Sequence, residues 1–184
     1  MEDPGGVQGG EATLVSVNVG RPRSVEWRGR SVTTAIWKAP VAGAVAIRGV
    51  NLLGDDQADR RVHGGPDKAV YAYAVEDYEW WAATAGPLGP GTFGENLTTR
   101  GIALGDCAIG DRWHVGGAVL EVAQPREPCF KLGIRMGDDG FPERFEVAIG
   151  AAGVVVVGRD RDFADRQAGE GRFAQRDLFA PCHH

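Results

Sequence analysis

Short runs of β-branched and apolar residues, repeatedly interrupted by glycine and proline, constrain this chain most strongly. Residues 12–20, 31–37, 43–50 and 69–74 are runs of this kind. The 184 residues include 28 glycines and 10 prolines, many of them between the runs. Short runs bounded by turn residues are typical of strands. The pattern predicts a mainly β protein, either a β-barrel or a folded sheet, with a few short helices.

Two segments predict helices. In residues 75–86, Val75, Tyr78 and Trp81 lie at helical spacing, and a Gly-Pro pair ends the segment. Residues 141–150 have a proline in the first turn and a glycine just past the expected end, which also favours a short helix.

One hairpin is predicted over residues 112–123. Two alternating apolar runs flank Gly116 and Gly117, and a glycine pair between such runs is a strong turn signal. Residues 153–157 are consecutive glycine and valines, and they predict a further strand.

The length and charge of the chain limit its organisation and partners. We expect a disordered lead-in over residues 1–12, one β-barrel domain over residues 13–158, and a tail over residues 159–184. The net charge of −5 gives no basic surface for nucleic acid. No apolar run is long enough to span a membrane.

The ends and the cysteines indicate the compartment. Residues 1–12 lack the basic and apolar segments of a secretion signal. The three cysteines are widely spaced, which argues against a disulfide framework and favours a reducing, cytoplasmic setting.

The segment QPREPCFKL is the most unusual in the chain. Pro125 and Pro128 exclude a helix interior or a central strand, so the segment is expected to form a stiff loop after a strand. The loop holds Cys129 between Arg126 and Lys131. Cationic neighbours favour the thiolate form of cysteine, which suits this loop to chemistry.

Three interpretations of Cys129 remain open from the residues alone. Free cysteine is often a small buried apolar residue. A nucleophilic cysteine needs a base, for which His63 and His114 are candidates. A metal-binding cysteine needs a soft metal. A zinc site from these residues and Cys107 is poorly supported, because no two of them lie at ligand spacing.

The motif HGGPDK is a candidate anion site. Gly64 and Gly65 follow His63 and let backbone amides approach a ligand closely, and Lys68 adds a positive charge. The alternative is an ordinary glycine turn with a surface lysine.

The motif TFGENLTT offers the same choice between a ligand site and a turn. Asn96 supplies hydrogen-bonding groups, and Gly94 permits an unusual backbone conformation. Together with Gly89 and Gly91, Gly94 matches the dinucleotide-binding pattern, but no strand precedes the glycines and Pro90 interrupts them, so we reject that site.

An acidic cluster precedes HGGPDK. Asp55, Asp56 and Asp59 lack the alternating acids and closing glutamate of a calcium loop. We interpret the cluster as a solvated turn, in which an aspartate pairs with Arg60 or Arg61.

Several motifs together resemble one family. The segments GDDQADRRVHGGPDKAVYAY, GTFGENLTTRGI, GDCAIGDRWHVGGAVLEV and QPREPCFKL resemble, in order and spacing, the MOSC domain. This family is named for the C-terminal part of molybdenum cofactor sulfurases, and the likeness is to its small stand-alone bacterial members of the YiiM type. It extends from about Ser31 to Phe145, and the tail beyond departs from the family's closing strand.

The resemblance implies a β-barrel of the MOSC type that binds the molybdenum cofactor, molybdopterin. Cys129 matches the family cysteine that coordinates the metal. The residues implied to line the same pocket and bind the cofactor are His63, Gly64, Gly65, Lys68, Asn96, Arg126 and Lys131.

The resemblance also implies an activity. Members of this type look like reductases that convert N-hydroxylated compounds, such as hydroxylamino purines, to amines with electrons from a separate reductase. The alternatives are a non-catalytic carrier of molybdenum cofactor or sulfur, and a metal-free cysteine enzyme. Pyridoxal phosphate belongs to the desulfurase domain of full-length sulfurases and is not expected in this chain. The oligomeric state stays open.

Overall fold

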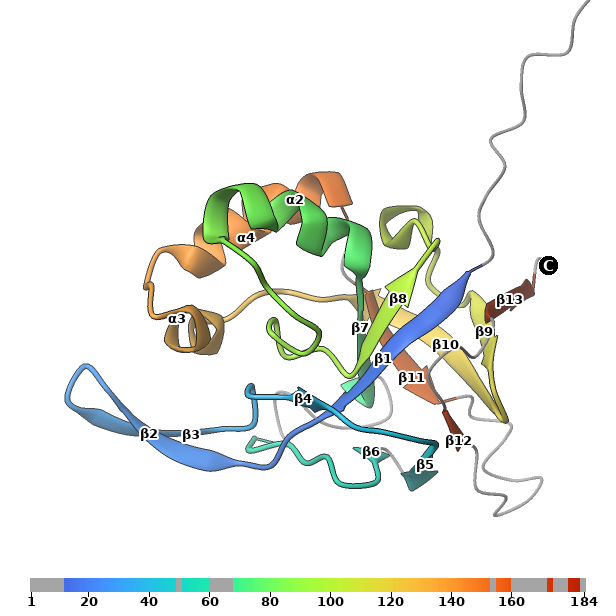
Figure 1. The fold of residues 1–184 in the computed structure, drawn as a ribbon, viewed down its shortest axis with the longest axis horizontal. Helices are drawn as coiled ribbons and strands as arrows, with labels where there is room; N and C mark the ends of the chain where they lie inside the picture. Colours follow the sequence, from blue (N-terminus) through green and yellow to red (C-terminus); the bar gives the residue numbers. More distant parts are fainter. Residues whose placement is uncertain are drawn as a thin grey trace, which may run out of the picture.

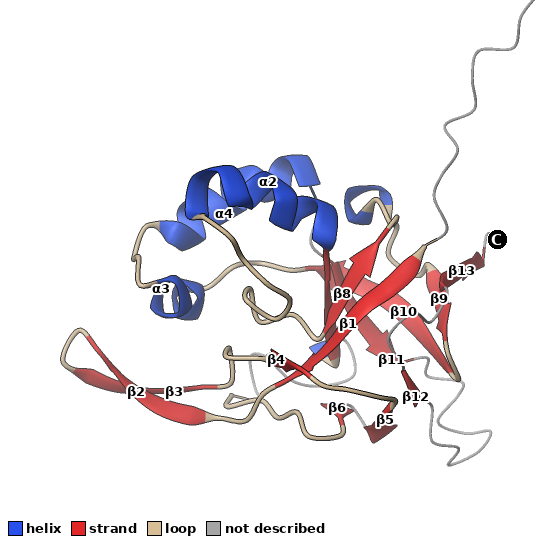
Figure 2. Cartoon of the chain, in the orientation of Figure 1, coloured by secondary structure: helices blue, strands red, loops and turns tan. Residues whose placement is uncertain are grey.

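The computed structural model describes residues 12–48, 51–59, 68–152, 155–159, 172–173 and 179–182. Within these residues the protein is mainly β, with short helices gathered on one side of a large sheet (Figure 2). The sheet has eight strands in the order β13-β9-β10-β11-β7-β8-β1-β4. In chain order these are β1 (Thr13–Val19), β4 (Ala39–Pro40), β7 (Val70–Ala74), β8 (Leu97–Arg100), β9 (Arg112–Val115), β10 (Ala118–Pro125), β11 (Val155–Arg159) and β13 (Phe179–Cys182).

Of the described strand pairs in this sheet, β7 and β8 alone run parallel. Parallel neighbours need a crossover, and α2 (Val75–Ala85) supplies it, because it begins directly where β7 ends. Because the two strands are parallel, the loop from α2 enters β8 at the same end of the sheet at which β7 begins.

The other strands form two smaller units. β5 (Val45–Arg48), β6 (Asn51–Leu52) and β12 (Arg172–Phe173) make a three-stranded sheet. β2 (Arg23–Trp27) and β3 (Arg30–Thr34) make a two-stranded ribbon that extends away from the main sheet (Figure 1). Its turn has positive φ at Arg28 (53°) and Gly29 (71°), as a tight hairpin requires.

Two hydrophobic clusters stabilise the described part of the chain. One fills the space between the strands and includes Leu14, Leu97 and Leu120, each 0% exposed. The other is largely aromatic and packs the helices onto β7. At its centre the Tyr73 ring lies 4.9 Å from the Phe93 ring and 5.7 Å from the Phe145 ring, measured between centroids. This cluster fixes the helices against the sheet.

The other helices follow the QPREPCFKL loop. α3 (Phe130–Met136) begins immediately after Cys129, and α4 (Phe141–Ala152) follows it. Gly137 ends α3 in the left-handed conformation, with φ of 66°. A short 3-10 helix, η2 (Leu104–Asp106), precedes β9. No helix in the described ranges has the length and apolar character to span a bilayer.

The structure confirms the mainly β class, the four early strands, the helix from Val75, the hairpin over residues 112–123 and the late valine strand. Three details differ. The described pairings leave the large sheet open, rather than closed into a barrel. The helix from Phe141 continues through Gly150 to Ala152, and α3 was not predicted.

The predicted disordered lead-in lies outside the described residues, apart from Ala12. The domain limits at residues 13 and 158 stay a prediction. The described parts of the tail form strands, since β12 pairs with β5 and β13 pairs with β9 at the edge of the large sheet.

Candidate functional site

A pocket of about 670 Å³, counted with its open mouth, lies where the loops after β3 and β10 meet the starts of β7 and β8. Its lining residues are Thr34, Ala35, Ile36, Lys38, Asp56, Gln57, Ala58, Asp59, Lys68, Tyr71, Phe93, Gly94, Asn96, Arg126, Cys129 and Lys131.

The pocket brings together five residues predicted to belong to one site: Lys68, Asn96, Arg126, Cys129 and Lys131. His63, Gly64 and Gly65 lie outside the described residues. The other candidates for a cysteine's base or a zinc site do not line the pocket: His114 is exposed on β9, and Cys107 follows η2.

Cys129 is held from both sides. Before it, β10 continues to Pro125, which pairs with Val155 of β11. After it, α3 begins, and the carbonyl of Cys129 accepts the backbone N–H of Leu132 at 2.8 Å. The thiol is half-buried in the pocket wall. Arg126 in the same loop places its guanidinium 5.5 Å from the centroid of the Tyr71 ring. The loop is shorter than predicted, since Pro125 is the last residue of β10, a central strand that the proline was expected to exclude, and Phe130 already begins α3.

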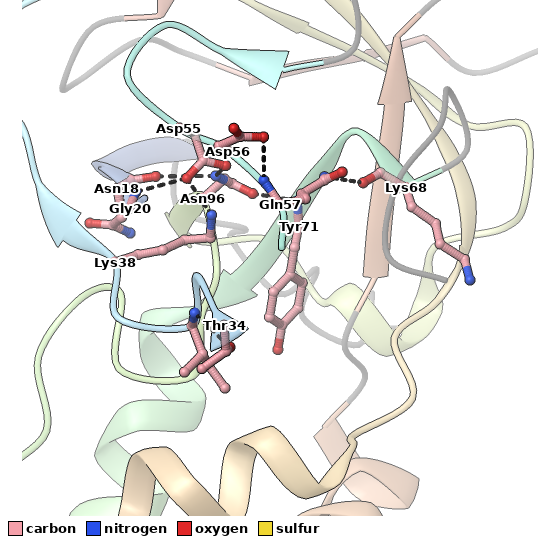
Figure 3. Close-up of polar contacts among 11 residues, drawn as sticks. Asn18, Gly20, Thr34, Lys38, Asp55, Asp56, Gln57, Lys68, Tyr71 and Asn96 are labelled. Atoms are coloured by element: carbon pink, nitrogen blue, oxygen red, sulfur yellow. Dashed lines mark hydrogen bonds and ion pairs between the residues drawn. The ribbon is translucent and has the colours of Figure 1, made fainter. Parts of the chain in front are cut away.

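Lys38, another residue of the pocket lining, belongs to a buried ion pair (Figure 3). Lys38 Nζ lies 2.5 Å from Asp55 Oδ1, and the two side chains are 8% and 1% exposed. The N–H of Gly20 donates to the same oxygen at 2.7 Å. Burial lowers the pKa of Lys38, and the negative charge of Asp55 opposes that shift. The charge of Lys38 is therefore compensated within the protein by Asp55.

The interpretation of Asp55 as part of a solvated turn is therefore wrong. Its carboxylate can be buried because Lys38, 17 residues earlier, compensates the charge. Asp56 and Asp59 of the same cluster line the pocket. Sequence reasoning missed Lys38 altogether, although a lysine within the run AIWKAPV is an available signal.

Asn96 organises the wall behind the ion pair. Its Nδ2 donates to Asp55 Oδ2 at 2.9 Å and to the Asn18 carbonyl at 3.2 Å. Its Oδ1 accepts the backbone N–H of Tyr71 at 3.3 Å. Both amide hydrogens are used within the protein, so Asn96 positions Asp55, and through it Lys38, rather than offering a free donor to a ligand.

Glu95, the neighbour of Asn96, is a second buried carboxyl group, 0% exposed. Its Oε1 accepts hydrogen bonds from the Tyr78 hydroxyl at 2.6 Å, the Gly91 N–H at 2.6 Å and the Thr98 hydroxyl at 2.8 Å. Its Oε2 has no hydrogen-bond partner among the described residues. Burial raises the pKa of Glu95, which favours its neutral form, while the hydrogen bond from Tyr78 opposes the shift.

Gly91 lies between Glu95 and Lys38, the partner of Asp55. Its φ of +84° is one that L side chains rarely adopt, and an added Cβ would meet the Lys38 carbonyl oxygen at 2.6 Å. The loop before β8 can therefore pass close to Lys38 only with glycine at this position.

The charges and donors of the pocket suit an anionic ligand with one soft attachment point. The lining holds four cationic side chains, Lys38, Lys68, Arg126 and Lys131, against the carboxylates of Asp56 and Asp59, and Lys38 is itself paired with Asp55. Cys129 supplies a thiol. Across the described ranges no three His, Cys, Asp or Glu side chains gather closely enough to chelate a metal.

A family model described as "MOSC domain" matches residues 59–170. Among curated proteins, the chain is 42% identical over 126 residues to YflK of Bacillus subtilis, described as uncharacterized, covering 68% of this chain and 57% of that protein. It is 41% identical over 103 residues to YiiM of Escherichia coli, covering 54% and 46%. The matched region thus spans about half the length of these two relatives.

A third relative is a protein of Gibberella moniliformis named "Reductase", 37% identical over 127 residues, which are 66% of this chain and 22% of that protein. Among solved structures, YiiM from Geobacillus stearothermophilus superposes with a TM-score of 0.67 at 29% identity, covering 94% of this chain and 75% of that one. YiiM from Escherichia coli superposes with a TM-score of 0.63 at 22% identity, covering 94% and 70%, which supports the fold alone.

Proposed function

The chain belongs to the MOSC domain family, and from this premise we propose that it binds the molybdenum cofactor and reduces N-hydroxylated compounds to amines. Hydroxylamino purines are the substrates we favour, and a separate reductase is the electron donor. The observation that carries the proposal is the meeting of the Cys129 thiol with four cationic side chains in one pocket. The fungal relative named a reductase supports the reaction class.

The residues present fit this cofactor. Molybdopterin is an anion with a phosphate group, and phosphates are recognised through charge-assisted hydrogen bonds from lysine and arginine. Lys68, Arg126 and Lys131 line the pocket and would serve that purpose, whereas the ammonium group of Lys38 is paired with Asp55. A soft metal centre favours a thiolate ligand, which Cys129 can provide.

We assign roles accordingly. Cys129 would hold the metal, while Arg126 and Lys131, on the same loop, would offset the charge of thiolate and cofactor. Asn96 would act indirectly, since its amide is bound to Asp55. His63, Gly64 and Gly65 stay in the proposal as cofactor-binding residues.

When bound, the cofactor supplies two-electron chemistry, so that an N–OH group, two electrons and two protons give an N–H group and water. The chain's own part is to fix the thiol, orient the substrate and provide positive charge. The 184 residues hold three cysteines, too few for the four cysteine ligands of an iron–sulfur cluster, so the electrons would come from outside these residues. A reducing, cytoplasmic setting is part of the proposal, because Cys129 must stay unoxidised.

The test is to purify the protein from a host that makes the cofactor and to measure molybdenum and pterin. We expect both in the wild type and in Cys107→Ser, the matched control outside the pocket, and neither in Cys129→Ser. Metal retained by Cys129→Ser would contradict the role of Cys129 as the metal ligand. Metal absent from the wild type, with the host's own molybdoenzymes loaded, would instead favour a metal-free cysteine enzyme.

The loaded protein is then assayed for reduction of hydroxylamino purines with an artificial electron donor. We expect turnover in the wild type. Bound cofactor without turnover would indicate that the protein carries molybdenum cofactor or sulfur to another enzyme.

A further inference from the structure

Lysine is an uncommon residue in this chain, and the structure gathers it at one place. The 184 residues include three lysines against 17 arginines. All three, Lys38, Lys68 and Lys131, line the pocket. Outside the pocket the chain uses arginine rather than lysine. The chemical difference is that an ammonium group can give up its proton, whereas a guanidinium group in a protein cannot.

The ammonium group of Lys38 is held inside the protein. Its side chain is 8% exposed, and Nζ lies 2.5 Å from Asp55 Oδ1. Asp55 is fixed in turn by hydrogen bonds from the Gly20 N–H and the Asn96 amide, which hold its carboxylate in place. Figure 3 shows the Lys38 side chain directed at this carboxylate. The position of Nζ is therefore set before a ligand binds.

The ion pair does not use all the donors of Lys38. An ammonium group has three N–H bonds, and among the described residues Asp55 alone accepts one of them. The side chain is not fully enclosed, and the residue contributes to the lining of the pocket. A largely buried ammonium group with unused donors favours a ligand that brings an oxygen acceptor.

Resting on the proposed function, we propose that Lys38 is the catalytic acid of the reduction: its ammonium group binds the oxygen of the substrate N–OH group and donates a proton to it as the N–O bond breaks. The departing oxygen leaves as water. The nitrogen takes the two electrons, which come from the separate reductase, and a second proton from solvent. The neutral amine of Lys38 then regains its proton from water. Asp55 and Asn96 are positioning residues, because they act through Lys38.

The electrostatics of the site support proton donation. Burial lowers the pKa of Lys38, the negative charges of Asp55 and Glu95 oppose that shift, and the positive charge of Arg126 adds to it. A lowered pKa makes the ammonium group a stronger acid toward a substrate oxygen. The acid form is lost as pH rises through this pKa, so kcat should fall on the alkaline side, below the ordinary lysine value near 10.5.

The first test measures binding without turnover. Protein loaded with cofactor, but given no electron donor, is titrated with 6-hydroxylaminopurine and with adenine, the amine product that lacks the oxygen. With 15N at the lysine side chains, the chain gives three Nζ signals, and Lys38→Arg identifies the signal of Lys38. We expect 6-hydroxylaminopurine to bind at least about tenfold more tightly than adenine, as a hydrogen bond to a charged group provides, and to shift that signal. Equal binding of the two compounds, or an unshifted signal, would overturn the inference.

The second test separates the proton from the charge. Lys38→Arg keeps a cation and its donors, so it should retain the cofactor and bind substrate, yet lower kcat by about 100-fold or more and remove the alkaline fall in kcat. Arg30→Lys, the opposite exchange at an exposed position of β3, is the matched control and should leave both unchanged. Wild-type kcat in Lys38→Arg would overturn the inference.

The variant Lys38→Met/Asp55→Asn covers the case in which Lys38→Arg does not fold, because it removes the ion pair without leaving a buried charge. It should keep molybdenum and pterin, and lose both the turnover and the preference for 6-hydroxylaminopurine over adenine. Loss of molybdenum and pterin from both variants would assign Lys38 to cofactor binding and overturn the inference. Because the titration needs no electrons, its failure is distinct from failure of the proposed reduction.

Discussion

The region around Asp55 and the region around Glu95 each bury a carboxyl group beside Asn96, but they stabilise it differently. Asp55 faces the ammonium group of Lys38 at 2.5 Å. Glu95 receives its hydrogen bonds from hydroxyl groups and a backbone amide, and its second oxygen has no partner among the described residues. Asp55, next to the pocket residue Lys38, is a charged carboxylate that a cation compensates. Burial without a cation instead favours the neutral form of Glu95.

The largest expected loss of stability comes from removing one partner of the Lys38–Asp55 ion pair. Asp55→Asn leaves the Lys38 ammonium group buried without its counter-charge and sets an amide opposite Asn96. Removing one partner of a buried ion pair typically costs about 3–5 kcal/mol. We expect a loss of that size in the free energy of unfolding, measured by urea denaturation.

The double variant Lys38→Met/Asp55→Asn is the control for this effect. Without the stranded charge, it should be at least about 1 kcal/mol more stable than the sum of the single substitutions predicts. Strictly additive losses would show that the pair is not coupled.

Substitution of Glu95 should lower the free energy of unfolding by less. Glu95→Gln keeps an oxygen for the three hydrogen bonds and adds an amide group where no acceptor is present, so we expect a loss of about 1–2 kcal/mol. Since the pKa of Glu95 is raised in the folded state, wild-type stability should fall as pH rises above its usual value near 4.5. The variant should lose that part of the pH dependence, and an unchanged slope would count against a neutral Glu95.

Asp77, in the first turn of α2, tests whether partial burial also raises the pKa of a carboxyl group, as full burial does for Glu95. Burial, aided by the charge of Glu76, raises the pKa of Asp77 from 3.8 to about 7. Its ionisation should thus destabilise the protein as pH rises between those values. Asp77→Asn should be more stable than the wild type at pH 8 by less than about 1 kcal/mol, because solvent screens a half-buried group.

The corresponding NMR titration of the Asp77 carboxyl carbon should have its midpoint near 7. A midpoint near 4 would place Asp77 with ordinary surface carboxylates.

The smallest effect is expected at an exposed pair. Arg28 and Asp139 have side chains that are 69% and 44% exposed, and such pairs contribute about 0.5 kcal/mol or less. Arg28→Ala should therefore barely change the urea midpoint relative to Arg30→Ala. A loss as large as that of Asp55→Asn would mean that burial does not set the size of these effects.

The sequence predicts best what depends on near neighbours. The helix from Val75 and the hairpin at Gly116 are encoded by spacing and turn residues within a dozen positions, and both are present. The Cys129 loop does follow a strand, as predicted, and its cationic neighbours, Arg126 and Lys131, line the pocket.

What depends on distant neighbours was missed. Asp55 looks like a turn residue until Lys38 is placed against it, and no local signal fixes that contact. β2 and its pairing with β3 were not foreseen either, because the turn between them uses Arg28 with Gly29 rather than the usual asparagine or aspartate. The open sheet differs from the expected barrel because closure depends on pairing between strand edges, which short runs do not specify.

The hydrogen bond from Asn96 to the Asn18 carbonyl spans 78 positions of the chain, and the Cys129 loop enters the pocket still later. Contacts of such long sequence separation form slowly, since a large loop must close first. On the ribosome the pocket therefore cannot assemble until Lys131, the last of its lining residues in the chain, has left the exit tunnel.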